Sequence, residues 1–378
     1  MVHTATLTYF LKGAEYQLYR NFIKLDDTVF MPNKTIWCNR RLTDRGITIM
    51  AKHHQWGNFS TCLMIIRINF KRVIEQKDRI VVATEKDTYE VAAAFDELLE
   101  TLLPGMPTFY AWKVNRIDYC VNVRTSYVKE YIELLQKSRI PYNMKIPPNE
   151  HRNKCFRPGS YYVISKVRDR RTKKTGSTTI NIYDKYQELL SQQRKDPSIT
   201  DDIVNQGKDI LRIEVQCHKP KTEYLKVKHH MESKNIHLFL DSTIGYEVLH
   251  AALCNICGTA DFQRKGVADA MIDNLKCSSK KKTKLKDIVK STGSVQQTKE
   301  DYISNGVMTK ETFNSYLKLL ENHNINAVTI SDTKHLPGKS YKDGLESLWT
   351  LFNDAYMEEL QDDVELLYEY DDDIEYYL

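Results

Sequence analysis

The chain has 378 residues, of which 41% are hydrophobic and 28% charged, as in soluble globular proteins. It contains only 14 Gly and 10 Pro, which excludes collagen-like and wholly low-complexity chains. No apolar run approaches the ~20 residues that a membrane helix needs. The first residues also lack the pattern of a secretory signal, so we expect a cytoplasmic protein without a membrane partner.

The net charge of +5 combines two parts of opposite charge. Residues 358–378 hold ten Asp or Glu and no Lys or Arg, which leaves 55 basic against 40 acidic residues in the body. Such a basic body suits a polyanionic partner such as nucleic acid, although a Lys-rich solvated surface gives the same balance. We expect the acidic segment itself to be a disordered tail.

Eight cysteines are scattered along the chain, as in a protein with free thiols in a reducing compartment. Cys254 and Cys257 form one CxxC pair, but no second pair follows at zinc-ribbon spacing. The surrounding residues have helical spacing. Two small buried residues therefore explain the pair better than a zinc site.

Strand patterns rich in β-branched and aromatic residues fill the first third of the chain. A helix is predicted over 89–103, where Pro104 and Gly105 end it, and it is followed by a strand over 109–123 and a helix over 126–136. Residues 140–158 have the composition of a loop. The early strands are predicted at 5–11, 35–38, 47–56 and 62–70.

Further strands are predicted at 159–166, 178–184 and 210–217, with a helix at 185–193. Residues 166–174 hold six Lys or Arg in nine positions and predict a basic hairpin. From 222 onward the spacing is helical, and the Lys-rich segment 276–290 is predicted to be an exposed connector. The clearest helices there are predicted at 224–234, 244–257, 260–275 and 309–322.

The order of these elements predicts an α+β protein. We expect an antiparallel-sheet catalytic domain with flanking helices over 1–240 and a mostly helical, DNA-binding domain over 241–357. The acidic tail would complete the chain. The glycine-rich phosphate loops GxxxxGK[ST] and GxGxxG do not occur in the sequence, so no nucleotide cofactor is expected.

Three predicted strand segments, 114–123, 178–184 and 210–217, combine an apolar face with a chemically rich polar face, because strand side chains alternate with a period of two. If the strands share one sheet, their polar faces come together, and the first turn of the following helix adds Glu188. The polar side chains concerned are Arg116, Asp118, Tyr183, Lys185, Arg212 and Glu214.

This set of side chains suits phosphodiester chemistry. Carboxylates on adjacent strands bind a hard divalent ion such as Mg²⁺ or Mn²⁺. A tyrosine hydroxyl can act as a covalent nucleophile, and Arg and Lys stabilise the charge of the transition state. The same residues on an exposed sheet face could instead form only cross-strand ion pairs.

The three segments resemble the signature of the replication initiators of filamentous-type phages, and of related plasmid initiators and mobilisation relaxases without histidine metal ligands. That signature has an Arg-Ile-Asp strand, a Tyr-x-Lys-x-x-Glu segment and an Arg-[Ile/Phe]-Glu strand in this order. The resemblance covers residues 60 to 240. The matching residues are Arg116-Ile117-Asp118, Tyr183, Lys185, Glu188 and Arg212-Ile213-Glu214.

The resemblance implies a nickase that begins rolling-circle replication. Tyr183 would attack one DNA strand to give a 5′-phosphotyrosyl link and a free 3′-OH that primes synthesis, and the strand is later rejoined. Lys185 and Arg212 would assist this catalysis. Asp118, Glu188 and Glu214 would hold Mg²⁺ or Mn²⁺. Tyr186 is a possible second nucleophile, although helix packing is the simpler role for it.

Duplex origin DNA and single-stranded DNA are the expected partners, with a host helicase or polymerase as a further one. Residues 309–322, a turn at 323–324 and residues from 326 onward resemble a helix-turn-helix. The Lys-rich connector offers a second stretch for phosphate contacts. The expected phosphate-binding residues are Arg116 and, in the basic hairpin, Arg168, Arg170, Arg171, Lys173 and Lys174.

Other readings of the sequence remain open. A plasmid initiator or conjugative relaxase would use the same tyrosine chemistry. A metal-dependent nuclease would activate water and form no covalent link. A non-catalytic DNA-binding regulator would need the basic surface but not Tyr183.

Overall fold

The structure, a computed structural model, describes residues 1–12, 15–31, 34–56, 59–75, 79–147, 156, 159–166, 176–290, 292–340 and 343–369. The segment 167–175, which contains most of the predicted basic hairpin, lies outside the described residues. The predicted phosphate-binding residues Arg168, Arg170, Arg171, Lys173 and Lys174 all fall in that segment.

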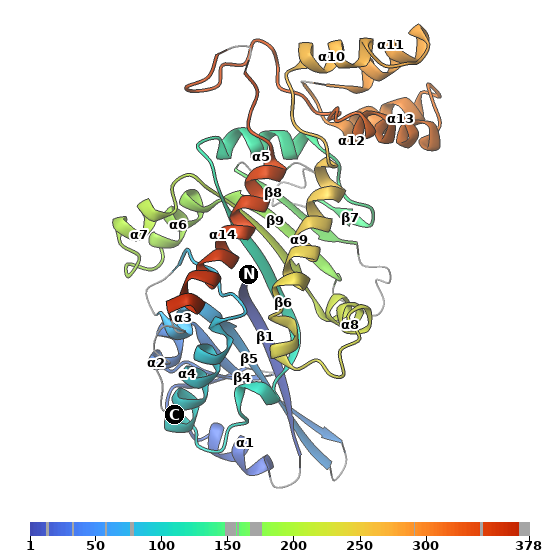
Figure 1. Ribbon diagram of the computed structural model, residues 1–378. Coiled ribbons are helices and arrows are strands. Elements are labelled where there is room, and N and C mark those ends of the chain that lie inside the picture. The colour runs from blue at the N-terminus through green and yellow to red at the C-terminus, as the bar shows by residue number, and fades with distance from the viewer. Residues whose placement is uncertain are drawn as a thin grey trace, which may run out of the picture.

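One antiparallel sheet runs through the molecule (Figure 1). Its strands are β1 (Val2–Leu11), β2 (Thr28–Met31), β3 (Lys34–Trp37), β4 (Ile47–Trp56), β5 (Phe59–Asn69), β6 (Lys113–Arg124), β7 (Met144–Lys145), β8 (Ser160–Ser165), β9 (Thr178–Asp184) and β10 (Ile210–Cys217). They are ordered β2-β3-β4-β5-β1-β6-β10-β9-β8-β7. The predicted α+β class is therefore confirmed.

Helices flank this sheet and form most of the C-terminal part. They are α1 (Tyr16–Phe22), α2 (Arg40–Asp44), α3 (Phe70–Ile74), α4 (Asp87–Leu102), α5 (Val128–Lys137), α6 (Lys185–Gln193), α7 (Asp201–Gln206), α8 (Lys219–Lys228), α9 (Ser242–Cys257), α10 (Lys265–Asp273), α11 (Ser279–Ile288), α12 (Val295–Ser304), α13 (Lys310–Asn322) and α14 (Leu348–Glu369), with short 3₁₀ helices at Phe109–Ala111 and Ile236–Phe239. No helix of the described part is both long and apolar enough to cross a membrane.

The apolar faces of β6, β9 and β10 form the centre of the core. Ile213 of β10 lies opposite Val121 of β6 and Ile182 of β9, and all three side chains are buried. Helices α5, α8 and α9 pack against these strands. Tyr119 Oη donates to the Phe239 carbonyl at 3.0 Å, which shows that the second 3₁₀ helix closes over this face.

The helical C-terminal part shares the core of the sheet. Helix α9 contacts β6 and β10, and α14 contacts β6. The rings of Tyr246 and Phe352 join α9 to α14 with centroids 5.7 Å apart. Residues from Met1 to Ala355 belong to one buried hydrophobic cluster. The predicted division near residue 240 therefore does not separate two cores.

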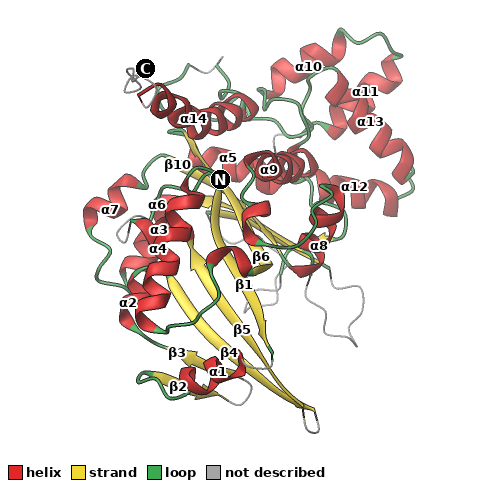
Figure 2. Ribbon diagram, turned by 60° about the horizontal axis from the view of Figure 1, so that its bottom comes forward, coloured by secondary structure: helices red, strands yellow, loops and turns green. Residues whose placement is uncertain are grey.

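Helices α10 to α13 stand apart from the sheet as a group (Figures 1 and 2). The predicted helix-turn-helix is wrong in its second half, because the described residues between α13 and α14 form no helix. Val328 and Ile330 are instead buried in extended chain that bridges to Lys290 and Arg264. The Lys-rich connector is also different from the expectation, since it contains helix α11.

Helix α14 continues to Glu369, so residues 358–369 are helical where the sequence predicted a disordered tail. Leu360, Val364 and Leu367 recur at helical spacing among the acidic residues, which favours continuation of the helix. Residues 370–378 lie outside the described part. Cys254 and Cys257 lie within α9, as the helical spacing predicted.

We expect Phe352→Ala to lower the free energy of unfolding of the whole protein by about 3–5 kcal/mol, because it empties a fully buried site between α14 and α9. Chemical denaturation followed by intrinsic fluorescence measures the change. The exposed neighbour Asp354→Ala is the matched control on the same helix. A loss no larger than that of the control would contradict the packing of α14 onto the core.

Candidate active site

The three motif strands lie side by side in the sheet, and their polar side chains share one face. In the register of β10, Arg212 lies opposite Tyr183 of β9, and Gln216 lies opposite Asp118 of β6. Glu214, between them on β10, points to the same face because strand side chains alternate. The predicted common face for Asp118, Tyr183 and Glu214 is therefore confirmed.

Tyr183 is held by Glu214. The Tyr183 Oη donates to Glu214 Oε2 at 3.3 Å. Only 8% of the tyrosine is exposed, and burial raises its pKa well above 10.0, while the charge of Arg212 opposes this rise. The phenol is therefore protonated at rest, and its proton points at a carboxylate that can accept it.

Asp118 has a dense set of donors. Arg116 Nε donates to Asp118 Oδ1 at 2.7 Å and Arg116 Nη2 donates to Oδ2 at 2.7 Å. Thr4 Oγ1 from β1 also donates to Oδ2. Arg116, the predicted phosphate-binding arginine, is half-buried and forms an ion pair with Asp118. The two parallel hydrogen bonds from Arg116 fix the orientation of the Asp118 carboxylate on this face of the sheet.

Asp118 and Glu214 are two acids close enough for their charges to interact. Burial raises the pKa of Glu214, and the charge of Asp118 raises it further, although Gln216 donates to Glu214 Oε1 at 2.8 Å. A cation between the two carboxylates would relieve this repulsion, so the pair fits a hard divalent ion. No group of three metal-ligating side chains occurs among the described residues, so Glu188 does not complete a triad with them.

Glu188 pairs with Lys185 instead. Lys185 Nζ donates to Glu188 Oε2 at 2.8 Å across the first turn of α6. Asp184 begins this helix as its N-cap and accepts from the Gln187 backbone N–H. The cap turns the chain directly after Tyr183, and Lys185 is thereby buried beside the tyrosine strand.

Arg212 is a buried cation next to Tyr183. Its Nε donates to Asn122 Oδ1 at 2.8 Å, and its Nη2 donates to the Ile80 carbonyl. Its Nη1 is buried and has no hydrogen-bond partner among the described residues. The charge of Arg212 lowers the pKa of Tyr183 and of Lys185, so it acts on the site through its field.

His3 is a site residue that the sequence did not reveal. Its Nδ1 lies 3.9 Å from Glu214 Oε2, and its Nε2 lies 3.4 Å from Asn69 Nδ2. Burial, followed by the charges of Arg212 and Lys185, holds the pKa of His3 well below 6.5. The imidazole is therefore neutral at neutral pH and resists protonation beside Glu214.

The acidic helix α14 also reaches this region. Burial raises the pKa of the Glu359 carboxyl to about 7, although the charges of the Met1 amine and of Arg212 lower it in part. The Met1 amine itself donates to the Ala83 carbonyl. An acidic side chain of α14 therefore lies close enough to Arg212 to feel its charge.

We expect Lys185 to make stability rise with pH. Burial, followed by the charge of Arg212, lowers its pKa from 10.5 to about 8. Between these pH values the unfolded chain still binds the proton and the folded protein does not, so this group favours folding increasingly as the pH rises. Below about pH 8 both states carry the proton, and the penalty for the buried charge is complete.

Thermal unfolding of the wild type and of Lys185→Met between pH 7 and pH 10.5 measures this effect. The difference in Tm should move in favour of the wild type over this range, because other titrating groups are common to both proteins. A difference that is independent of pH would contradict a lowered pKa for Lys185.

In comparison with known proteins, no protein-family model, no curated protein and no solved structure matches the chain. Any assignment of activity therefore depends on the residues and the geometry of this face.

Proposed function

We propose that the protein nicks and rejoins one DNA strand through a covalent tyrosine intermediate, and so initiates rolling-circle replication in a host cytoplasm, as the phage initiators that its motifs resemble do. One observation carries the proposal. The Tyr183 hydroxyl donates to Glu214 on a sheet face that also holds Asp118, and two buried cations are close in the fold, Arg212 opposite Tyr183 on β10 and Lys185 at the start of α6. A plasmid initiator or conjugative relaxase would use the same chemistry.

In the proposed cleavage step the Tyr183 Oη attacks the scissile phosphorus and gives its proton to Glu214. The bond from phosphorus to the 3′ oxygen breaks, and this oxygen takes a proton from Lys185. The products are a 5′-phosphotyrosyl link and a free 3′-OH. Lys185 suits the role of acid because a pKa of about 8 lies close to neutral pH.

The other polar residues of the face stabilise charge. Arg212 lies opposite Tyr183 on the neighbouring strand, and its Nη1 has no hydrogen-bond partner among the described residues, so its field favours both the phenolate and the negative phosphate. Asp118 and Glu214 would hold Mg²⁺ or Mn²⁺, which polarises phosphoryl oxygens when it is bound. Rejoining reverses the cleavage step, with the 3′-OH as the attacking group.

The proposal is tested by incubating the protein with Mg²⁺ and a supercoiled plasmid that carries the DNA flanking its own gene. Denaturing gels should show nicked DNA with protein bound to the 5′ end. The same plasmid without the flanking DNA is the control. Nicks with free 5′ phosphates would identify a nuclease that activates water, and binding without nicks would identify a regulator.

A further inference from the structure

A groove of about 1410 Å³ lies at the β7 edge of the sheet. One wall consists of the end of α5 and the chain that follows it to Ile146, and the other consists of α12 and the start of α13. Pockets that bind small ligands enclose roughly 300–1,000 Å³. The size of the groove therefore favours an extended polymer as its ligand.

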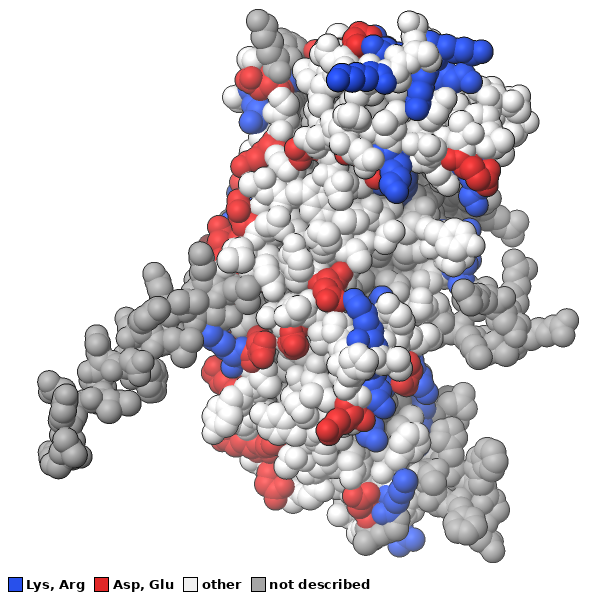
Figure 3. Space-filling model, turned by 45° about the vertical axis from the view of Figure 1, so that its right-hand side comes forward, with Lys and Arg blue, Asp and Glu red and all other residues white. Residues whose placement is uncertain are grey.

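The groove is positively charged. Among the described residues, its lining includes six cations but only two acids, Glu133 and Glu300. Burial lowers the pKa of Lys299, and the nearby charges of Lys310 and Arg139 lower it further. Lys and Arg side chains also gather over helices α10 to α13 at the top of Figure 3. The six cations are Lys137, Arg139, Lys145, Lys166, Lys299 and Lys310.

The groove lining also contains an exposed aromatic side chain, Tyr142. Tyr142 is 86% exposed and follows Pro141 in a turn that the Met144 N–H closes onto the Pro141 carbonyl at 3.0 Å. Asn143 takes the left-handed position of this turn, with φ of 63°. The turn orders the backbone at Tyr142 and leaves its ring exposed, where a nucleic acid base can stack on it.

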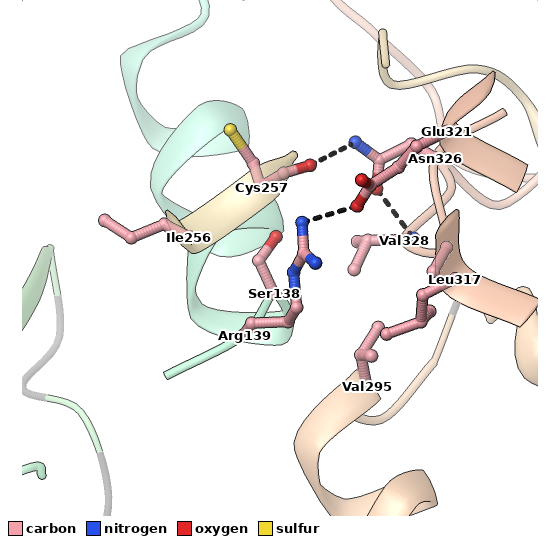
Figure 4. A pocket seen from close by; sticks show the side chains of 10 residues that line it. Ser138, Arg139, Ile256, Cys257, Val295, Leu317, Glu321, Asn326 and Val328 are labelled. Atoms are coloured by element: carbon pink, nitrogen blue, oxygen red, sulfur yellow. Dashed lines mark hydrogen bonds and ion pairs between the residues drawn. The ribbon is translucent and has the colours of Figure 1, made fainter. Parts of the chain in front are cut away.

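The two walls are held together, so the groove exists before a ligand binds. Arg139 Nη2 donates to Glu321 Oε1 of α13 at 2.6 Å (Figure 4). Asn326 Nδ2 donates to the Cys257 carbonyl at the end of α9 at 3.0 Å. The cavity between these residues is only about 10 Å³, so the contact between the two walls leaves no space for a ligand.

We propose that this groove binds single-stranded DNA, with its phosphates on the lysines and a base stacked on Tyr142. The identity of the ligand rests on the proposed function, whereas the charge and shape of the groove do not. A single strand is favoured over a duplex because only unpaired bases offer their faces for stacking. The strand order β9-β8-β7 places the groove two strands from Tyr183, beside Lys166 at the end of β8.

Fluorescence anisotropy with a labelled oligothymidine of roughly 16 nucleotides, without Mg²⁺, tests the proposal. Tyr142→Ala should weaken binding roughly 5- to 150-fold, the range of one stacked base. The double variant Lys145→Glu, Lys310→Glu should also weaken binding and reduce its dependence on salt, by a slope of about 0.7 for each lost phosphate contact. Lys12→Glu, Lys24→Glu, which changes exposed lysines near α1, is the matched control and should bind like the wild type.

A duplex of the same length distinguishes the two kinds of ligand. Tyr142→Ala should leave duplex binding unchanged, and an equal loss for both DNAs would overturn the proposal. Wild-type affinity in both groove variants would overturn it as well. Tyr183→Phe should keep single-strand binding. Absence of nicking by the wild-type protein, with intact and groove-dependent binding, would reject the proposed function but not the groove.

Discussion

The Tyr183→Phe variant is expected to lose DNA cleavage and the covalent protein–DNA adduct together. The substitution removes the hydroxyl that donates to Glu214 and leaves the buried ring in place, so the fold should be retained. Loss of an attacking group lowers turnover by roughly 10⁴-fold or more. Denaturing gels of plasmid nicking, with thermal unfolding as the check on folding, measure both effects.

Tyr186→Phe is the matched control. Tyr186 is the second residue of α6, and its ring packs against the small cluster around Ile80, with the ring centroid 5.7 Å from Lys208 Nζ. This packing role predicts full cleavage in the single variant and no further loss when the change is added to Tyr183→Phe. An adduct that persists in both single variants and in the double variant would show that another tyrosine attacks.

Asp118→Asn and Glu214→Gln are each expected to lower nicking by roughly 10²–10⁴-fold, the contribution of a positioned acid or base. Glu214→Gln keeps the size of the side chain but cannot take the proton of Tyr183. Asp118→Asn removes a charge from the pair of acids that fits a divalent ion. DNA affinity should be retained or rise in Asp118→Asn, because Arg116 loses its ionic partner and becomes free to bind phosphate.

Nicking and gel-shift assays on the same preparations separate the two effects. Glu97→Gln, an exposed carboxylate on α4, is the control and should leave both unchanged. Normal nicking in both Asp118→Asn and Glu214→Gln would mean that the two acids serve only as partners of Arg116 and Gln216 within the sheet.

The strands that carry the candidate site were predictable because local signals agreed. The period of two gave β9 and β10 their observed bounds, and the change to helical spacing after Asp184 gave α6. Helix α8 begins earlier than predicted, at Lys219, since Pro220 at its first turn is a start signal that outweighs the later apolar spacing.

The burial of the site was not predictable from the same pattern. A period of two shows that Asp118 and Glu214 face one way, but not that His3 and the Ile80 segment close over that face. His3 precedes the predicted first strand, and its place beside Glu214 depends on the irregular pairing of β1 with β6 between Val2 and Thr4. Long-range pairing of this kind leaves no local signal.

The C-terminal errors have a similar cause. Helix α11 buries only Leu285 and Ile288, so its Lys-rich sequence shows little apolar periodicity. After α13, Val328 and Ile330 are buried in extended chain that bridges to distant residues, where the sequence predicted a second helix. In both segments tertiary contacts, rather than helix propensity, decide the structure.

Mapping the attached residue by mass spectrometry tests the central claim most directly. The protein is incubated with Mg²⁺ and the supercoiled plasmid, the DNA is trimmed by nuclease, and the peptides are sequenced. We predict a nucleotide remnant on Tyr183, linked through a 5′ phosphate. Cleaved DNA with no modified tyrosine, or with the remnant on a tyrosine other than Tyr183, would contradict the assignment.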